Sequence, residues 1–399
     1  MADARANFVS NEDYVARARA LAPVLRERAA MTNEMRRVPD ETIADFKESG
    51  LFGLLKPERF GGADRGLEPY LDSVIELAQG CGSAGWVFSV LSIHVFHVGL
   101  FPLAAQEDVW GDNPDAIIAS SYMPGAKAAR ENGGFRITGR WKFSSGCDAA
   151  DWFILGASHG MRATEPPRPE VWFCLVPRAD VEIVDTWHVI GLKGTGSKDV
   201  ATRDAYVPAH RILNMADALE ARTPGREVNP GPLFALPMYS VFPLCIASPA
   251  VGVAKGAVNL YIEEMKTRIV TSRGGESVAD YHATQTRLGE AAALADCAEL
   301  LLRRDAKHTM DVMRQGRPLT VEERVRNRRD HAFAADLSVR AVDLLYKMTG
   351  GAGLHNESAL QRHFRDAHAI GSHIANNWDI SGPLYGRVML GRPPGTGTY

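Results

Sequence analysis

The stretch Tyr346–Asn377, YKMTGGAGLHNESALQRHFRDAHAIGSHIANN, decides how the rest of the chain is organised. An apolar helical run ends there at Gly350–Gly353, where glycine allows positive φ angles and lets a second backbone or a ligand come close. The following segment, Glu357–Ile370, has apolar residues at helical spacing and carries the charged pair Arg365-Asp366. The pattern predicts a helix, a glycine-rich turn and a second helix near the C-terminus.

Three histidines recur in this stretch at intervals of five residues: His363, His368 and His373. Five residues rotate a helical side chain by roughly 140° from the starting face, so the three side chains cannot converge on one metal ion. The interpretations that remain are surface histidines on a packing helix, or a histidine that takes part in chemistry. We expect no metal site here.

The composition, 45% apolar and 23% charged over 399 residues, is typical of a soluble globular protein with two or three structural units. The formal net charge of -3 gives no reason to expect nucleic acid or an anionic membrane as a partner. Five widely spaced cysteines without a CxxC pattern predict reduced thiols rather than disulfides or zinc. The N-terminus is polar and has no signal-peptide pattern, so we expect a cytoplasmic protein.

One apolar stretch, Gly85–Leu103, has no formal charge and nearly reaches the length of a membrane-spanning helix. It contains two histidines and two serines, with Pro102 near its end, and no second stretch of this kind is recognised in the sequence. We therefore expect a helix that is buried all round inside a protein core, and no membrane association.

The periodicity of the chain divides it into three parts. Residues 1–115 have helical spacing of apolar residues. Residues 116–232 contain six short β-type runs separated by turn residues, which predicts a small β-barrel or sandwich. Residues 233–399 contain long helical runs that predict a bundle, and long apolar bundles often form oligomers. Strands and helices do not alternate, so a Rossmann unit is excluded, and the expected fold class is α+β with several domains.

The glycine turn followed by Arg-Asp-Ala resembles the C-terminal signature of the acyl-CoA dehydrogenase superfamily. The order of helices, β-structure and helices resembles that fold too: an N-terminal helical domain, a central β-barrel or sandwich and a C-terminal four-helix bundle. The resemblance implies that Gly350 and Gly351 lie against a flavin, often that of a neighbouring subunit, and that the protein is a homotetramer formed through the bundle.

Two motifs of the β-region resemble the flavin site of the same superfamily. Gly191–Asp199, GLKGTGSKD, which alone predicts only a tight β-turn, is followed by Val207–Arg211, VPAHR, as in segments that border the flavin. Trp141–Gly146, WKFSSG, is similar to the strand whose hydroxyl meets flavin N5, and the matching hydroxyl is that of Ser144. The resemblance implies flavin contacts from Trp141, Phe143, Ser144, Ser145, Thr195 and Ser197. Arg268 or Arg273 matches the arginine for the flavin phosphate, and the spacing leaves open which of them serves.

The chain departs from the dehydrogenases at their catalytic base. Their glutamate follows Arg-Asp-Ala, where this chain has Ser372-His373-Ile374-Ala375, and the alternative position for a base holds Phe242. Removal of an α-proton from a thioester needs a positioned base, so acyl-CoA dehydrogenation has no support. The WKFSSG form resembles the flavin-dependent monooxygenases of the same fold, the oxygenase components of p-hydroxyphenylacetate and secosteroid hydroxylases.

This second resemblance implies an oxygenase component of a two-component monooxygenase. It would receive reduced flavin (FMNH2 or FADH2) from a separate NAD(P)H-flavin reductase, react with O2 through a C4a-hydroperoxyflavin, and hydroxylate a small phenolic or heteroaromatic substrate. His373 has the type and place of a general base for the phenol. The alternatives are a flavin dehydrogenase or oxidase of the acyl-CoA dehydrogenase type, and an inactive scaffold with the same fold.

The substrate contacts follow from the same resemblance. His94, on the apolar helix, and Ser120 or Ser121 stand where the related hydroxylases contact the phenol, and Phe242 also faces that place. His97, one helical turn after His94, is its rival. A histidine on a buried helix is more often a satisfied core residue than a ligand contact, so both interpretations stay open from sequence.

Overall fold

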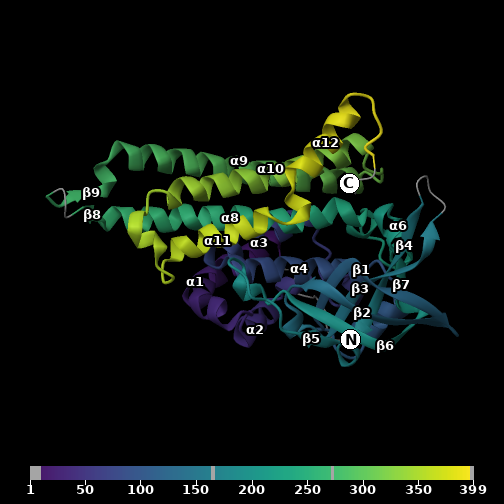
Figure 1. Cartoon of the computed structure of the whole chain (residues 1–399). Helices are drawn as coiled ribbons and strands as arrows, with labels where there is room; N and C mark the ends of the chain where they lie inside the picture. The colour runs from purple at the N-terminus through teal and green to yellow at the C-terminus, as the bar shows by residue number, and fades with distance from the viewer. Residues whose placement is uncertain (1–9, 163–166, 271–273, 396–399) are drawn as a thin grey trace, which may run out of the picture.

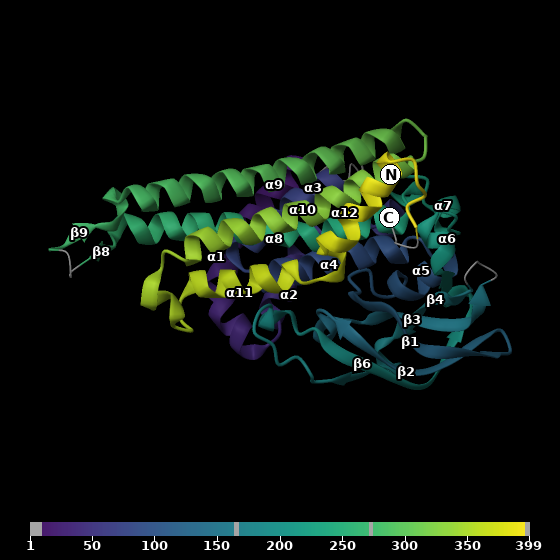
Figure 2. The ribbon, with the colours of Figure 1, turned by 45° about the horizontal axis from the view of Figure 1, so that its top comes forward.

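A computed structural model of the chain describes residues 10–162, 167–270 and 274–395. Figure 1 shows N-terminal helices and a β-sheet on one side of a long bundle of C-terminal helices, and Figure 2 shows the same layers from a second direction. The N-terminal helices are α1 (Asn11–Met35), α2 (Asp40–Glu48), α3 (Leu67–Gly80), α4 (Gly82–Val98) and α5 (Leu103–Trp110). The N-terminal helical part that the sequence predicts is thereby confirmed.

The central region is one mixed sheet with seven strands among the described residues, in the order β5-β6-β2-β1-β3-β4-β7. It therefore has two edge strands, β5 and β7, in the region where the sequence predicted a small β-barrel or sandwich. β1 and β3 are parallel, and a bulge between Ser121 and Ala126 bends β1. The strands are β1 (Ile118–Glu131), β2 (Gly134–Ser144), β3 (Trp152–Arg162), β4 (Arg168–Pro177), β5 (Glu182–Val184), β6 (Lys198–Pro208) and β7 (Ile212–Asn214).

The C-terminal part is a bundle of long helices, as predicted. Two short helices, α6 (Met215–Leu219) and α7 (Gly225–Val228), lead into it, and the hairpin β8 (Ile269–Val270) and β9 (Glu276–Ser277) joins its first two long helices. The glycine turn forms η10 (Gly350–Leu354), and η11 (Ile374–Asn376) follows further on. The bundle consists of α8 (Met238–Thr267), α9 (His282–Arg314), α10 (Val321–Tyr346), α11 (Ala359–Gly371) and α12 (Trp378–Met389).

Local sequence accounts for where the bundle helices begin. A capping box opens α10, because the Thr320 hydroxyl accepts from the Glu323 amide while the Glu323 carboxylate accepts from the Thr320 amide. Ser358 caps α11 through the amide of Gln361. The apolar stripe of α11, which includes Leu360, Ala367 and Ile370, is buried against α8 and α10.

The apolar helices are core helices. Every residue of α4 is buried, which confirms the buried helix expected there. α8 is also long and apolar enough to cross a membrane by length and composition, a feature that was not recognised from the sequence. Because 89% of its most apolar window is buried inside the fold, α8 is accounted for as the central helix of the bundle.

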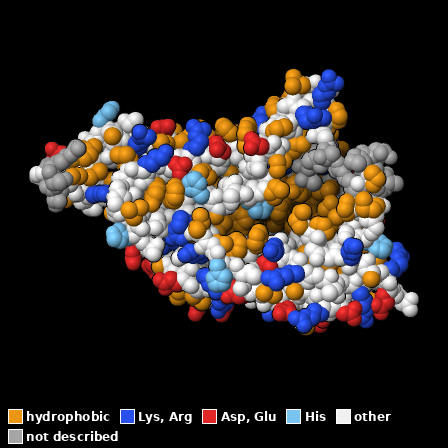
Figure 3. Space-filling view, in the orientation of Figure 1, with side chains coloured by type: hydrophobic (Ala, Val, Ile, Leu, Met, Phe, Trp, Pro, Cys, Tyr) orange, Lys and Arg blue, Asp and Glu red, His pale blue; other side chains and the backbone are white. Residues whose placement is uncertain are grey.

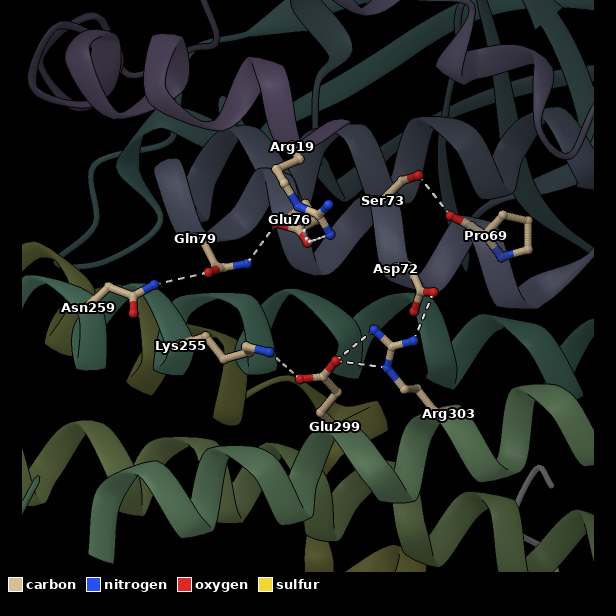
Figure 4. A network of polar contacts seen from close by, with 10 residues as sticks. All are labelled: Arg19, Pro69, Asp72, Ser73, Glu76, Gln79, Lys255, Asn259, Glu299 and Arg303. Atoms are coloured by element: carbon tan, nitrogen blue, oxygen red, sulfur yellow. Dashed lines mark hydrogen bonds and ion pairs between the residues drawn. The ribbon is translucent and has the colours of Figure 1, made fainter. Parts of the chain in front are cut away.

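A ladder of polar contacts joins the N-terminal helices to the bundle (Figure 4). Arg303 on α9 pairs with Asp72 on α3 at 2.9 Å and with Glu299 at 2.7 Å. Glu299 also accepts from Lys255 on α8. The ladder fixes the N-terminal helices against the same bundle that carries the C-terminal segment Ser372–Ala375.

The Arg-Asp pair of α11 holds the loop that precedes β6. Asp366 Oδ1 accepts from the Leu192 amide at 2.6 Å, and the Arg365 guanidinium donates to the Ile190 carbonyl at 2.6 Å. A Cβ on Gly191 would lie 2.1 Å from the Arg365 carbonyl oxygen, so only glycine fits between loop and helix. The Arg-Asp-Ala motif thus fixes the position of the loop that carries Thr195 and Ser197.

Asp366 gives a pH-dependent contribution to stability. Burial raises the pKa of Asp366 to about 6, although the hydrogen bond that it accepts from the Leu192 amide acts to lower the pKa. Between the ordinary carboxyl pKa and this raised value, the folded chain binds more protons than the unfolded chain. The free energy of unfolding should therefore fall as pH rises from 4 to 7, by roughly 2–3 kcal/mol from this group.

Asp366→Asn keeps an oxygen acceptor and cannot ionise, so the variant should lack this fall. We expect it to match wild type near pH 4 in urea unfolding and to exceed it at pH 7. Asp336→Asn, on an exposed part of α10, is the control. A difference between wild type and Asp366→Asn that is the same at both pH values would contradict the assignment.

Candidate active site

His94 on α4 and Ser120 on β1 form a hydrogen-bonded pair. His94 Nδ1 lies 2.8 Å from the Ile118 carbonyl oxygen, which can only accept, so Nδ1 carries the proton. His94 Nε2 therefore accepts, and the Ser120 hydroxyl donates to it across 2.7 Å. Burial lowers the pKa of His94 to about 4, so the ring is neutral at neutral pH. With its only proton committed, Ser120 Oγ can accept but cannot donate a further hydrogen bond.

Tyr122 and His97 form a second pair beside the first. Tyr122 follows Ser120 by two residues, so both side chains lie on one face of β1. The Tyr122 hydroxyl is hydrogen-bonded to His97 Nδ1, while the buried Nε2 of His97 has no partner among the described residues. Burial raises the pKa of Tyr122 well above its usual value and lowers the pKa of His97 well below its own, so neither side chain is charged.

Aromatic rings from α8 and the C-terminal segment lie opposite this pair. The Phe242 ring centroid is 5.6 Å from that of Tyr122 and 6.3 Å from that of His373. The Trp86 ring of α4 is 5.7 Å from that of His373. Figure 3 shows a deep hollow lined mainly by hydrophobic side chains between the C-terminal helices and the sheet. Ring contacts link the predicted residues His94, Phe242 and His373 through Tyr122. Ser120 bonds to His94, so the four predicted residues lie close together.

His373 caps the turn η11 and has a defined proton position. Its Nδ1 accepts from the Ala375 amide at 3.1 Å, so the proton of the neutral ring lies on Nε2. Burial lowers the pKa of His373 to about 4, and the positive charge of Arg328 acts in the same direction. The Arg328 guanidinium donates to the Ala375 carbonyl at 2.8 Å, so both polar groups of Ala375 hold the turn. His373 is a neutral ring with a donor at Nε2.

A chain of hydroxyl groups runs along the floor of the loop at Gly191–Ser197. The Trp86 indole donates to Ser145 Oγ at 3.0 Å, and Ser145 Oγ lies 2.7 Å from Ser197 Oγ. Ser197 Oγ is 2.6 Å from Thr195 Oγ1, which donates to the Leu192 carbonyl at 2.9 Å. The indole can only donate and the carbonyl can only accept, so each hydroxyl proton points toward Leu192. Ser145 and Ser197 therefore have lone pairs left but no free proton.

The neighbouring residues of β2 face different ways. Ser144 is fully buried, and its Oγ has no partner among the described residues. Phe143 is 60% exposed, and its ring lies 5.4 Å from that of Trp187. Alternation along the strand therefore separates Ser144 from Phe143, and Ser145 rather than Ser144 joins the hydroxyl chain.

Two predicted site residues make hydrogen bonds within the sheet. The Trp141 indole donates to the Gly156 carbonyl at 2.6 Å and is buried. Ser121 Oγ donates to the Lys142 carbonyl at 3.0 Å, on the face of β1 opposite Ser120. The structure therefore brings neither side chain to the hollow.

The predicted phosphate site lies elsewhere. Arg268 donates to the Thr349 carbonyl at 2.8 Å, and a Cβ on Gly350, which has φ +62°, would lie 3.8 Å from Arg268. Gly351 has open space around its Cβ position. Figure 1 shows this end of the bundle, near β8 and β9, remote from the sheet. Arg268 and the glycine turn lie side by side, but they are far from the hydroxyl groups of Ser145, Ser197 and Thr195 in the same subunit. Arg273 lies outside the described residues.

Sequence reasoning missed three residues of the site. Trp86 precedes His94 by eight residues, about two helical turns, so it shares the face of α4. Tyr122 shares the face of Ser120 by strand alternation. These spacings could have found both residues, whereas nothing in the sequence around Arg328 signals its place beside His373. Within residues 10–162, 167–270 and 274–395, no group of three potential metal ligands occurs.

Comparisons with known proteins show which family the chain belongs to. The family model for the acyl-CoA dehydrogenase N-terminal domain matches residues 13–109, and that for the C-terminal domain matches residues 244–378. A relative from Rhizobium sp. (strain MTP-10005), named FADH(2)-dependent resorcinol hydroxylase, oxygenase component, is 39% identical over 95% of this chain and 94% of its own length.

Two solved structures are similar over nearly the whole chain. The crystal structure of 3-HSA hydroxylase from Rhodococcus sp. RHA1 has a TM-score of 0.90 at 36% identity and covers 97% of this chain and 98% of its own. XiaF from Streptomyces sp., solved with FADH2 and glycerol, has a TM-score of 0.88 at 29% identity, with 98% of both chains covered. The chain belongs to the family of flavin-dependent monooxygenase oxygenase components that is built on the acyl-CoA dehydrogenase fold.

Proposed function

We propose that this protein is the oxygenase component of a two-component monooxygenase that uses reduced flavin and O2 to hydroxylate a small aromatic substrate. One observation carries the proposal: the hollow is apolar, and its polar groups are neutral histidines and hydroxyls. The residues in contact with His373 include Trp86, Phe242 and Ala375, none of them a carboxylate. A dehydrogenase of this fold needs a carboxylate base at that place, and a hydroxylase does not.

The hydroxyl chain fits a reduced flavin. Ser145 and Ser197 offer lone pairs without protons, and the N5 atom of a flavin carries a hydrogen only in the reduced forms. Exposed Phe143 and the neighbouring Trp187 offer aromatic surface beside them. Reduced flavin, when bound, supplies the electrons that activate O2 for hydroxylation. FMN and FAD share the ring that these residues contact, so both are candidates.

Ser120 and His94 fit the hydroxyl of a phenol. Ser120 Oγ accepts from the phenol while its own proton moves to His94 Nε2, so the pair can relay the phenolic proton. The resulting imidazolium is disfavoured by burial but is attracted by the phenolate formed beside it. A phenolate ring is more nucleophilic than a phenol, which favours oxygen transfer to it.

The arrangement favours a different role for His373 from the general base suggested by the sequence. A base at Nε2 needs a bare nitrogen there, and the Ala375 amide already occupies the lone pair on Nδ1. We propose that His373 donates its Nε2 hydrogen to an oxygen of substrate or oxidant. This is the type of donor that stabilises negative charge in a water-poor site.

The partner and compartment follow from the same proposal. No nicotinamide-binding unit is recognised in the sequence, so a separate NAD(P)H-flavin reductase supplies the reduced flavin. The five cysteines are free, and four of them are buried, which supports work in the reducing cytoplasm. The resorcinol hydroxylase relative makes a small phenol such as resorcinol the first substrate to test.

A reductase-coupled assay tests the function. We expect the purified protein to convert resorcinol or p-hydroxyphenylacetate only when NADH, a flavin reductase, flavin and O2 are all present. Anaerobic reduction of bound flavin by a substrate, without any reductase, would establish the alternative, a flavin dehydrogenase or oxidase. If the protein binds neither oxidised nor reduced flavin, the remaining interpretation is an inactive scaffold with this fold.

Ser145→Ala should weaken the binding of reduced flavin about tenfold, because an acceptor opposite the reduced ring is lost. The binding of oxidised flavin should change less, since its N5 has no hydrogen to donate. Anaerobic titration followed by absorbance and fluorescence measures both constants. Ser144→Ala, the adjacent hydroxyl on the buried face of β2, is the matched control. An equal loss for the two redox forms, or a larger loss in Ser144→Ala, would return the flavin contact to Ser144.

We also propose a homotetramer. Within one subunit, Arg268 and Gly350, the predicted contacts for the flavin phosphate, lie far from the hydroxyl groups of Ser145 and Ser197. A neighbouring subunit would bring the two together across the bundle. Light scattering should give four chains, and Arg268→Ala should lower flavin affinity without changing the hydroxyl chain. A fully active monomer would contradict the shared site.

A further inference from the structure

We propose that Arg328 supplies the positive charge that stabilises a phenolate in the hollow, so that the site binds ionised phenols in preference to neutral ones. The inference rests on the proposed function and adds a substrate-class preference to it. Arg328 lies on α10 and is only 3% exposed. Its guanidinium carries a full charge at all physiological pH values.

The charge of Arg328 has no acidic partner among the described residues. Its Nη1 donates to the Ala375 carbonyl, its Nε is buried without a partner, and its guanidinium carbon lies 5.8 Å from the Tyr239 ring centroid. A buried charge is costly unless it is paired. The positive charge of Arg328 is therefore not compensated by the described residues, and a negatively charged ligand could compensate it.

Nearby acids on the same helix are engaged elsewhere. Asp330 pairs with Arg329 at 2.6 Å and also with Arg304. Arg324 pairs with Glu220 at 3.4 Å. Arg328 thus differs from Arg324 and Arg329, which have carboxylate partners in the folded chain.

The place of Arg328 is next to the reacting part of the site. It holds the turn η11 that orients His373, and Tyr239 lies 5.8 Å, between ring centroids, from Phe242 of the hollow. The titratable groups around it are His373, Tyr239 of α8 and His331 of its own helix. Burial lowers the pKa of His373 to about 4 and that of His331 to about 3, so neither adds positive charge at neutral pH.

The negative charge that matches Arg328 arises from the substrate. Transfer of the phenolic proton through Ser120 to His94 leaves the electron pair on the phenolic oxygen, and no other bond changes. A buried charge acts over a longer distance than a charge in water, because the effective dielectric constant around it is low. Arg328, which bonds to the turn behind His373, therefore favours a negative charge in the site. The Nε2 hydrogen of neutral His373 is a second group that favours negative charge on an oxygen in the site. Ser120 and His94 therefore take the proton, whereas Arg328 and His373 stabilise the charge that remains.

4-Nitrophenol tests the inference without turnover, because its ionised form absorbs at a longer wavelength. Titration of the full-length protein with this probe, from pH 5 to 9, gives the pKa of the bound phenol. We expect it to be lower than that of free 4-nitrophenol by about one unit or more, since an opposite charge nearby shifts a pKa by 1–3 units. Arg328→Gln should remove most of this shift, and Arg328→Lys should restore part of it.

Arg340→Gln, an exposed arginine on the same helix, is the charge-matched control and should leave the shift unchanged. Benzoate, a carboxylate without a phenol, should compete weakly, and competition equal to that of 4-nitrophenol would assign Arg328 to a carboxylate substituent instead. A bound probe in wild type with an unshifted or raised pKa would overturn the inference even if Arg328→Gln does not fold. If the probe does not bind wild type at all, the aromatic site of the proposed function is itself wrong.

Discussion

Replacing His373 by alanine should lower the rate of hydroxylation by about 10²–10³-fold, the loss expected when one preorganised donor is removed from a buried site. Flavin oxidation should continue, so that O2 is reduced to hydrogen peroxide instead of entering product. The ratio of product to NADH consumed, measured in the reductase-coupled assay, reports this uncoupling directly.

His373→Gln separates the donor role from the base role. A glutamine can accept from the Ala375 amide through Oε1 and donate through Nε2, but it cannot take up a proton. If His373 is a donor, the glutamine variant should keep most of the coupling that the alanine variant loses. His368→Ala, an exposed histidine paired with Asp343, is the control and should couple like wild type. Equal loss in the glutamine and alanine variants would favour the general base.

Replacing His94 by phenylalanine should slow hydroxylation by about 10²–10⁴-fold, because the proton of the phenol then has no acceptor behind Ser120. Ser120→Ala should have a similar effect, since it removes the link between substrate and imidazole. The two losses should not add in the double variant, because serine and histidine act as one relay. Product formation at saturating substrate measures all three.

Ser121→Ala is the matched control for this relay. Ser121 is adjacent in sequence but lies on the other face of β1, where it donates to the Lys142 carbonyl. It should affect stability more than hydroxylation. A loss of hydroxylation in Ser121→Ala as large as in Ser120→Ala would show that the strand registers differently at the site, and an unchanged rate in His94→Phe would transfer the role to His97.

Much of this fold could be predicted, because long helices show clear apolar periodicity in the sequence and the glycine-rich turns match motifs of the superfamily. The apolar spacing predicted long helices in the C-terminal part, where α8, α9 and α10 lie. The run at Gly85–Leu103 was identified as a buried helix. The form of the β-region could not be predicted, because single strands do not reveal their partners. The parallel pairing of β1 with β3 and the bulge after Ser121 join seven strands into one open sheet.

The candidate site could be predicted by residue type but not by orientation. His94, Ser120, Phe242 and His373 lie close together. The neighbouring Ser121 bonds to the Lys142 carbonyl instead, and Ser144 is fully buried. The sequence also could not show which ring nitrogen of each histidine carries the proton. That position depends on the Ile118 carbonyl for His94 and on the Ala375 amide for His373. Arg328 was missed because its significance lies in the absence of a carboxylate among its described contacts.

The central claim is that this chain inserts one oxygen atom from O2 into an aromatic ring with electrons from externally supplied reduced flavin. Mass spectrometry of the product formed under ¹⁸O2, with resorcinol, p-hydroxyphenylacetate and 4-nitrophenol as substrates and an unrelated flavin reductase, tests it directly. We expect a product that carries one ¹⁸O atom and that forms only when the chain, the reductase and flavin are all present. Hydrogen peroxide as the sole oxygen product with every one of these phenols that binds, or an oxidised product formed without O2, would contradict it.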